Sequence, residues 1–138
     1  MKISYGKNVY DRAEINAVLK TLKNGTQMGK AVRKFEIKVS KMFSKKYGLM
    51  VNSGSSALTL AMQSLNLKKN DEIITPCLNF GTAVSSIVIA GAKPVFVDID
   101  IETLQIDVNK IEEKITKRTV AFLIPNLIGN IPDIKKIY

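Results

Sequence analysis

The stretch DEIITPCLNFGTAVSSIVIAGAKPVFVD, residues 71–98, decides the fold. It opens with an apolar run at 73–75 that Pro76 closes, continues with a helix-compatible segment at 81–90, and ends with a second apolar run at 95–97. Short apolar strands without alternation, separated by a helix, are typical of βαβ units in a buried parallel sheet. The stretch therefore predicts one such unit.

The same pattern continues on both sides of this unit. Further apolar runs at 49–51 and 120–124 predict two more strands. Segments 56–65 and 108–115 predict helices between the strands. Because helices must then cover both faces of a parallel sheet, the fold class is α/β with four strands.

Two helices are predicted before the sheet. Asp11 followed by Glu14 fits a capping box, and apolar residues at helical spacing follow up to Gly25. A second helix fits residues 31–46. At the other end, the segment from Ile131 resembles the first turn of a further helix, so we expect the chain to be the front part of a longer protein.

Composition excludes several function classes. The 138 residues include 18 lysines, 3 arginines, one cysteine and no histidine, with a formal charge of +9. Without histidine, this chain alone cannot form a Ser-His-Asp site, a Cys-His site or a His-containing zinc site. Because lysine outnumbers arginine, a solvated basic face is favoured over a nucleic-acid surface. The single cysteine, and the lack of a signal peptide or of an apolar run of about 18 residues, favour a cytoplasmic protein without a membrane partner.

The segment Asn-Ser-Gly-Ser-Ser-Ala-Leu, residues 52–58, is the first candidate site. It lies where a predicted strand gives way to a helix, and helix N-termini bind phosphate through free N–H groups and a positive dipole end. Gly54 would let the backbone approach the anion, and Ser55 and Ser56 add hydroxyl donors. The alternative is a serine N-cap beside a permissive glycine.

Three further polar loops follow the other strands, at the sheet edge where ligands bind in open parallel sheets. Phe80 could stack on a flat heterocycle, although such a residue is more often core. Cys77 is expected to be a buried, inert thiol. Carboxylates at 98–102 fit turns and caps better than a Mg²⁺ site or a phospho-acceptor. The loop at 126–130 offers amides to a ligand or serves only as a turn. Together the loops predict a phosphate-bearing ligand.

Six stretches form a recognisable series along the chain: ISYGK (3–7), GKAVRKFE (29–36), NSGSSAL (52–58), TPCLNF (75–80), GAKPVFVD (91–98) and NLIGNIPD (126–133). The series resembles the N-terminal part of the DegT/DnrJ/StrS family of pyridoxal-phosphate (PLP)-dependent nucleotide-sugar aminotransferases and 3-dehydrases. The resemblance covers nearly the whole chain.

The resemblance implies a partial large domain of the aspartate-aminotransferase type, fold type I, with a mostly parallel sheet flanked by helices. Within residues 1–138, it assigns 1–30 to an N-terminal helical arm and 31–138 to βα units of the cofactor-binding sheet. A cytoplasmic homodimer is the implied assembly.

The resemblance also implies pyridoxal 5'-phosphate as the cofactor. In the family, the residues matching Ser55 and Ser56 hold the phosphate, and the aromatic residue matching Phe80 stacks on the pyridine ring. No residue of this chain matches the family's Schiff-base lysine or the aspartate that pairs with the pyridine nitrogen. We therefore expect no catalytic residue, no metal site and no transamination by this chain alone.

The implied function is that of an aminotransferase acting on a nucleotide-linked keto-deoxy sugar, with an amino-acid donor, in polysaccharide biosynthesis. One alternative is a 3-dehydrase of a CDP-4-keto-6-deoxy sugar, because Asn-Leu-Ile-Gly-Asn at 126–130 resembles that branch. A non-catalytic truncated remnant or an anion-binding α/β module is the other alternative.

Overall fold

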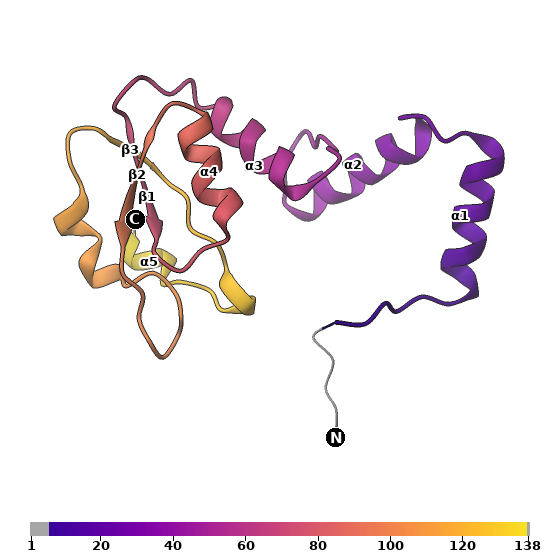
Figure 1. The fold of residues 1–138 in the computed structure, drawn as a ribbon. Coiled ribbons are helices and arrows are strands. Elements are labelled where there is room, and N and C mark those ends of the chain that lie inside the picture. The colour runs from indigo at the N-terminus through magenta and orange to yellow at the C-terminus, as the bar shows by residue number, and fades with distance from the viewer. Residues whose placement is uncertain (1–5, 138) are drawn as a thin grey trace. The chain divides into compact units, whose positions relative to one another are not determined.

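The computed structural model describes residues 6–137, which divide into two units between Met50 and Val51 (Figure 1). Of the family-like stretch at 3–7, residues 3–5 lie outside the described residues. The predicted division into a helical arm up to residue 30 and βα units beyond it stays a prediction.

The first unit contains two helices, α1 (Arg12–Asn24) and α2 (Lys30–Met42). The predicted capping box opens α1: the Asp11 carboxylate accepts from the Ala13 N–H at 2.7 Å, and the Asp11 N–H donates to Glu14 at 2.8 Å. Helix α2 ends earlier than predicted, because Ser44 adopts a left-handed φ of 52° and the Lys45 N–H turns back to the Ser40 carbonyl at 2.8 Å.

The strand predicted at 49–51 is wrong, because these residues have no strand partner. The Met50 N–H donates instead to the Glu36 carboxylate at 2.9 Å, within the same unit. An apolar run this short does not by itself distinguish a strand from a loop.

The second unit contains a parallel sheet in the order β2-β1-β3. Its strands are β1 (Glu72–Pro76), β2 (Lys93–Val97) and β3 (Thr119–Phe122). All five residues of the central strand β1 are buried, and its register places Ile74 beside Val95 on one side and Phe122 on the other. The parallel arrangement is as predicted, but the sheet of the described residues has three strands instead of four.

Helices α3 (Gly54–Gln63) and α4 (Gly81–Ile89) confirm two further predictions. Helix α4 connects β1 to β2, so that 72–97 form the predicted βαβ unit (Figure 1). Gly91 follows α4 with a φ of +87°, a conformation that glycine adopts without strain. Among the described residues, no helix has both the length and the apolar content to cross a membrane.

Two hydrophobic clusters hold the sheet, one on each face. The neighbours Ile73 and Ile74 are both fully buried and point to opposite sides of β1. Ile73 belongs to a cluster with α3 and α4, formed by Met62, Ile73, Ile87 and Ala92. Ile74 belongs to the other cluster, formed by Ile74, Val97, Ile106 and Ile111.

The helix predicted at 108–115 is wrong in type. The segment forms two 3₁₀ turns, η1 (Val108–Lys110) and η2 (Glu112–Lys114). A repeat of three residues brings Val108 and Ile111 to the same side, against the Ile74 cluster. Ile111 is buried and Val108 partly buried there, so both 3₁₀ turns are held against the sheet. Two short elements complete the chain, the 3₁₀ turn η3 (Leu127–Gly129) and α5 (Ile134–Ile137).

An ion pair between the buried Glu72 and the exposed Arg118 connects the start of β1 with the turn before β3. The Glu72 carboxylate accepts from the Thr116 hydroxyl at 2.6 Å and from the Arg118 guanidinium at 2.8 Å. The Thr116 hydrogen bond, followed by that of Arg118, lowers the pKa of Glu72 below its ordinary value of 4.5. The charged form of Glu72 is thus the one that stabilises the fold.

We therefore expect acid to weaken the fold partly through Glu72. Because its pKa is lowered in the folded state, its contribution is complete well above pH 4.5 and is lost as the pH falls through the folded-state pKa. Glu72→Gln should lower the urea midpoint at pH 7 and reduce the difference between the midpoints at pH 7 and pH 3.5. The exposed Glu113 provides the control, since Glu113→Gln should change neither. An unchanged midpoint difference in Glu72→Gln would refute the assignment.

Candidate functional site

The first turn of α3 has the arrangement of backbone groups that the anion-binding prediction requires. The Ser53 hydroxyl caps the helix by accepting from the Ser56 N–H at 3.1 Å. The N–H groups of Gly54 and Ser55 precede the first residue that can bond within the helix, so they remain available to a ligand. The first turn carries no acidic side chain, which leaves the positive end of the helix dipole uncompensated there.

Ser55 and Ser56 differ in their surroundings. Ser55 is exposed, whereas Ser56 is half-buried and its hydroxyl accepts from the Ser53 hydroxyl at 3.1 Å. The proton of the Ser56 hydroxyl is still free to be donated, since that contact uses only a lone pair. The alternative, a serine N-cap, is thus also present. Ser53 forms it, so the Ser55 side chain is not used for capping.

Phe80 lies at the end of the loop that follows β1, directly before α4. It is 71% exposed, so the alternative that it belongs to the core is excluded. Two hydrogen bonds of the Asn79 side chain hold the loop. Its oxygen accepts the Phe80 N–H at 2.7 Å, and its amide donates to the Thr75 hydroxyl at 2.9 Å. Thr75 is fully buried and donates to the Leu123 carbonyl at 2.8 Å.

The structure brings two of the predicted site residues together. A hollow of about 630 Å³ is lined by residues of α3 and by Phe80, namely Gly54, Ser55, Ala57, Leu58, Ala61 and Phe80. Its volume lies within the range of small-molecule sites, and its lining combines an apolar wall with an anion-binding helix end. Ser56 is not part of this lining. None of these side chains titrates near neutral pH, so the lining carries no acid–base group.

The Asn79–Thr75 contact was not predicted from sequence. The Thr75 hydroxyl that accepts from Asn79 is itself held by the Leu123 carbonyl. Thr75 and Leu123 are 48 residues apart, so the pairing of β1 with β3 is what brings them together. A local signal did exist, because asparagine in a loop commonly bonds to nearby backbone N–H groups.

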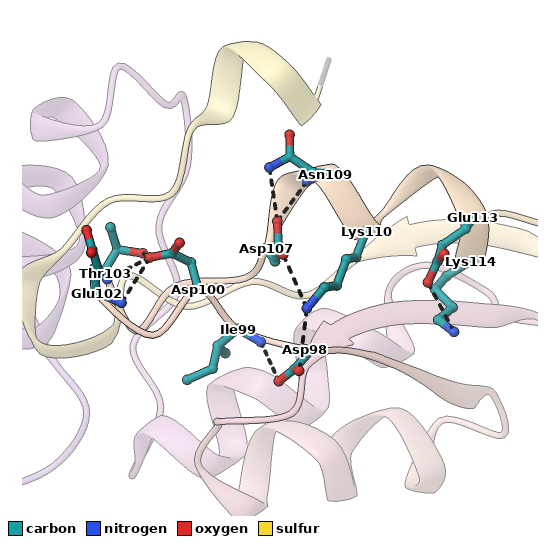
Figure 2. A network of polar contacts seen from close by, with 10 residues as sticks. All are labelled: Asp98, Ile99, Asp100, Glu102, Thr103, Asp107, Asn109, Lys110, Glu113 and Lys114. Carbon is teal, nitrogen blue, oxygen red and sulfur yellow. Dashed lines mark hydrogen bonds and ion pairs between the residues drawn. The ribbon is translucent and has the colours of Figure 1, made fainter.

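Two of the carboxylates at 98–102, those of Asp98 and Asp100, accept local N–H groups, as predicted for turn residues (Figure 2). Asp100 accepts from the Thr103 N–H at 2.8 Å and from its hydroxyl at 2.9 Å, and these bonds lower the pKa of Asp100. Asp98 accepts its neighbour's N–H at 2.8 Å. Within the described residues, no group of three His, Cys, Asp or Glu side chains is arranged to hold a metal ion.

Lys110 joins this turn to η1 (Figure 2). Its ammonium lies 3.4 Å from the Asp107 carboxylate and 3.6 Å from that of Asp98. The hydrogen bond to Asp107 and the charges of both carboxylates raise the pKa of Lys110. The charges of Asp98, Asp107 and Lys110 therefore pair with one another and stabilise the turn.

Two remaining loop predictions have different outcomes. Cys77 is exposed instead of buried, because Pro76 ends β1 and the chain leaves the sheet at that point. The loop at 126–130 forms η3, with left-handed φ values of 50° at Ile128 and 87° at Gly129. Gln105 donates to the Leu127 carbonyl at 3.1 Å, so the loop is held by the body of the second unit.

Comparison with known proteins gives a consistent result. The sequence profile of the DegT/DnrJ/EryC1/StrS aminotransferase family matches residues 8–138. GDP-4-keto-6-deoxy-D-mannose 3-dehydratase of Escherichia coli O55:H7 is 38% identical over 130 residues, which cover 89% of this chain and 34% of the relative. A dTDP-3-amino-3,6-dideoxy-alpha-D-galactopyranose transaminase of Aneurinibacillus thermoaerophilus is 36% identical over 129 residues, which cover 93% of this chain and 36% of the relative.

Among solved structures, a GDP-4-keto-6-deoxymannose-3-dehydratase with a trapped PLP-glutamate geminal diamine matches with a TM-score of 0.93 at 35% identity. The match covers 99% of this chain and 37% of the solved chain. This chain thus spans about a third of the length of the relatives that it matches. Its α/β fold is part of the fold of the PLP-dependent fold type I transferases, as the resemblance implied. The protein belongs to the DegT/DnrJ/EryC1/StrS aminotransferase family.

Proposed function

We propose that the hollow between α3 and Phe80 binds pyridoxal 5'-phosphate, with the phosphate at the first turn of α3 and the ring against Phe80. The observation that carries this proposal is the joint lining of one hollow by Gly54, Ser55 and Phe80. PLP in solved family members supports it, including an E. coli dehydratase with bound hydrated PLP.

The residues present fit this cofactor. A side chain built on Gly54 would meet no atom within 4 Å, so there is open space above the backbone for a phosphate. The N–H groups of Gly54 and Ser55 and the Ser55 hydroxyl would supply donors to the phosphate oxygens. Ser56 does not line the hollow, and its hydroxyl is proposed as a further donor from the same helical turn. The face of Phe80 offers a flat apolar surface to an aromatic ring. When bound, PLP supplies an electron sink for negative charge that develops beside the amino nitrogen.

The substrate class that we propose is a nucleotide-linked keto-deoxy sugar, aminated with an amino-acid donor in polysaccharide biosynthesis. Similarity to the transaminase from Aneurinibacillus thermoaerophilus supports amination. This proposal includes a homodimer. It also includes the division of the chain into a helical arm up to residue 30 and βα units from residue 31 onward.

Dehydration at C3 of such a sugar is the second candidate reaction. Similarity to GDP-4-keto-6-deoxymannose 3-dehydratases favours it. One such relative is 38% identical in sequence, and a solved structure of such an enzyme matches with a TM-score of 0.93. The sequence Asn-Leu-Ile-Gly-Asn at 126–130 favours the same branch. These relatives carry GDP in their names, so a GDP-linked sugar takes the place of the CDP-linked sugar in this candidate.

Translation of the coding DNA downstream of the Tyr138 codon tests which reaction applies. A lysine at the family's cofactor-attachment position would support amination. A histidine at that position would support dehydration. Coding sequence with neither residue would contradict both reactions and leave cofactor or anion binding as the function.

Replacement of Phe80 tests the site itself. We expect Phe80→Ala to weaken PLP binding about tenfold, because the aromatic face contributes about 0.5–1.5 kcal/mol beyond its buried area. Titration of PLP by absorbance, with equilibrium dialysis as a second measurement, gives the dissociation constant.

Phe43 is the matched control, since it is 70% exposed and lies in the first unit. Phe43→Ala should leave the dissociation constant unchanged. Equal affinity of Phe80→Ala and the unsubstituted protein would remove Phe80 from the site. No saturable binding by the unsubstituted protein would contradict the proposed function.

A further inference from the structure

Asn79 connects the exposed Phe80 to the buried centre of the sheet. Its side-chain oxygen accepts the Phe80 N–H at 2.7 Å, and its side-chain amide donates to the Thr75 hydroxyl at 2.9 Å. Asparagine has both an acceptor and a donor in one side chain, and both are used here.

The far end of this connection is fixed. Thr75 is fully buried in the central strand, and its hydroxyl donates to the Leu123 carbonyl at 2.8 Å. That carbonyl directly follows β3, which pairs with β1. The chain of hydrogen bonds therefore runs from the Phe80 backbone through Asn79 to two strands of the sheet.

Phe80 is held to α4 by its carbonyl, which accepts from the Ala83 N–H at 2.8 Å at the start of that helix. Its side chain is 71% exposed, so packing does not hold the ring in place. The bond from the Phe80 N–H to Asn79 therefore fixes the other side of the Phe80 backbone.

We propose that Asn79 is a positioning residue, which holds the Phe80 backbone so that its ring faces the hollow. This inference rests on the proposed function, because it assigns to Asn79 a role toward the bound cofactor. Asn79 itself does not line the hollow. It acts through Phe80, and Thr75 anchors it.

Two substitutions remove the connection from opposite ends. Asn79→Ala removes both side-chain bonds, and Thr75→Val removes the buried hydroxyl while keeping a similar shape. Thr75→Ser keeps the hydroxyl and serves as the conservative variant. Asn109→Ala is the matched control: it also deletes an asparagine side-chain bond, to Asp107 at 3.2 Å, outside the hollow.

The experiment measures two properties of each variant. Hydrogen exchange of the Phe80 amide, followed by NMR without cofactor, reports the bond to Asn79. Titration with PLP reports the affinity. We expect Asn79→Ala and Thr75→Val to speed the exchange and to weaken PLP binding, each about tenfold. Thr75→Ser and Asn109→Ala should match the unsubstituted protein in both measurements.

The outcomes separate this inference from the proposed function. If the unsubstituted protein binds PLP and Asn79→Ala binds it within a factor of two as tightly, Asn79 has no positioning role and the proposed function stands. Loss of affinity in Thr75→Ser as large as in Thr75→Val would also overturn the inference, since the hydroxyl would not matter. If the unsubstituted protein does not bind PLP, the proposed function fails and the inference fails with it.

Discussion

Replacing Ser55 with aspartate is expected to weaken PLP binding about 100-fold while leaving the protein at least as stable. The introduced carboxylate stands in the first turn of α3, where the phosphate is proposed to bind. The negative carboxylate and the negative phosphate would lie side by side there and repel each other strongly. The same carboxylate lies at the positive end of the helix dipole, where it stabilises the helix by about 0.3–1 kcal/mol. PLP titration and urea unfolding of the same samples measure the two effects.

The opposite signs make this prediction specific. A variant that lost affinity by unfolding would lose stability as well, which is the reverse of the expected result. Ser64→Asp is the matched control, because Ser64 is the C-cap of the same helix. There a negative charge should lower stability by a similar amount and leave PLP affinity unchanged. Unchanged affinity in Ser55→Asp would exclude the first turn of α3 as the phosphate site.

The second large effect concerns the sheet that positions the site. Ile73→Ala should lower the free energy of unfolding by about 2–5 kcal/mol, because Ile73 is fully buried and the substitution leaves a cavity beside α3 and α4. For a domain with a typical stability of about 5–15 kcal/mol, this is a large fraction of the total. Urea unfolding followed by circular dichroism measures the change.

Ile101 offers a matched control, since it is 80% exposed in the same unit. Ile101→Ala should change the unfolding free energy by less than about 0.5 kcal/mol. Similar losses at Ile73 and Ile101 would mean that the cluster around Ile73 is not the core of this unit.

Local patterns account for what the sequence predicted correctly. The capping box at Asp11 and Glu14 depends on residues three positions apart, and it forms as expected. The βαβ unit at 72–97 follows from two apolar runs, a helix between them and Gly91 as the helix end. Ser55 and Phe80 line one hollow, as the sequence predicted, but the start of α3 brings Ser55 there, since the strand predicted at 49–51 does not form in the described residues.

Contacts between distant residues account for the errors. The apolar run at 49–51 has the composition of a strand, but the Met50 N–H donates to the Glu36 carboxylate and not to a strand partner. The segment at 108–115 forms 3₁₀ turns in place of the predicted helix, with Val108 and Ile111 packed against the Ile74 cluster, a contact with a distant part of the chain. The support of Phe80 by Asn79 depends on Thr75 and on the neighbouring strand, which sequence spacing does not reveal.

The central claim is that the first turn of α3 and Phe80 form the PLP site. A crystal structure of the protein with PLP tests it most directly. We expect the phosphate within hydrogen-bond distance of the Gly54 and Ser55 N–H groups, with the pyridine ring against Phe80. PLP bound at any other place, or a crystal saturated with PLP in which this hollow is empty, would exclude the site.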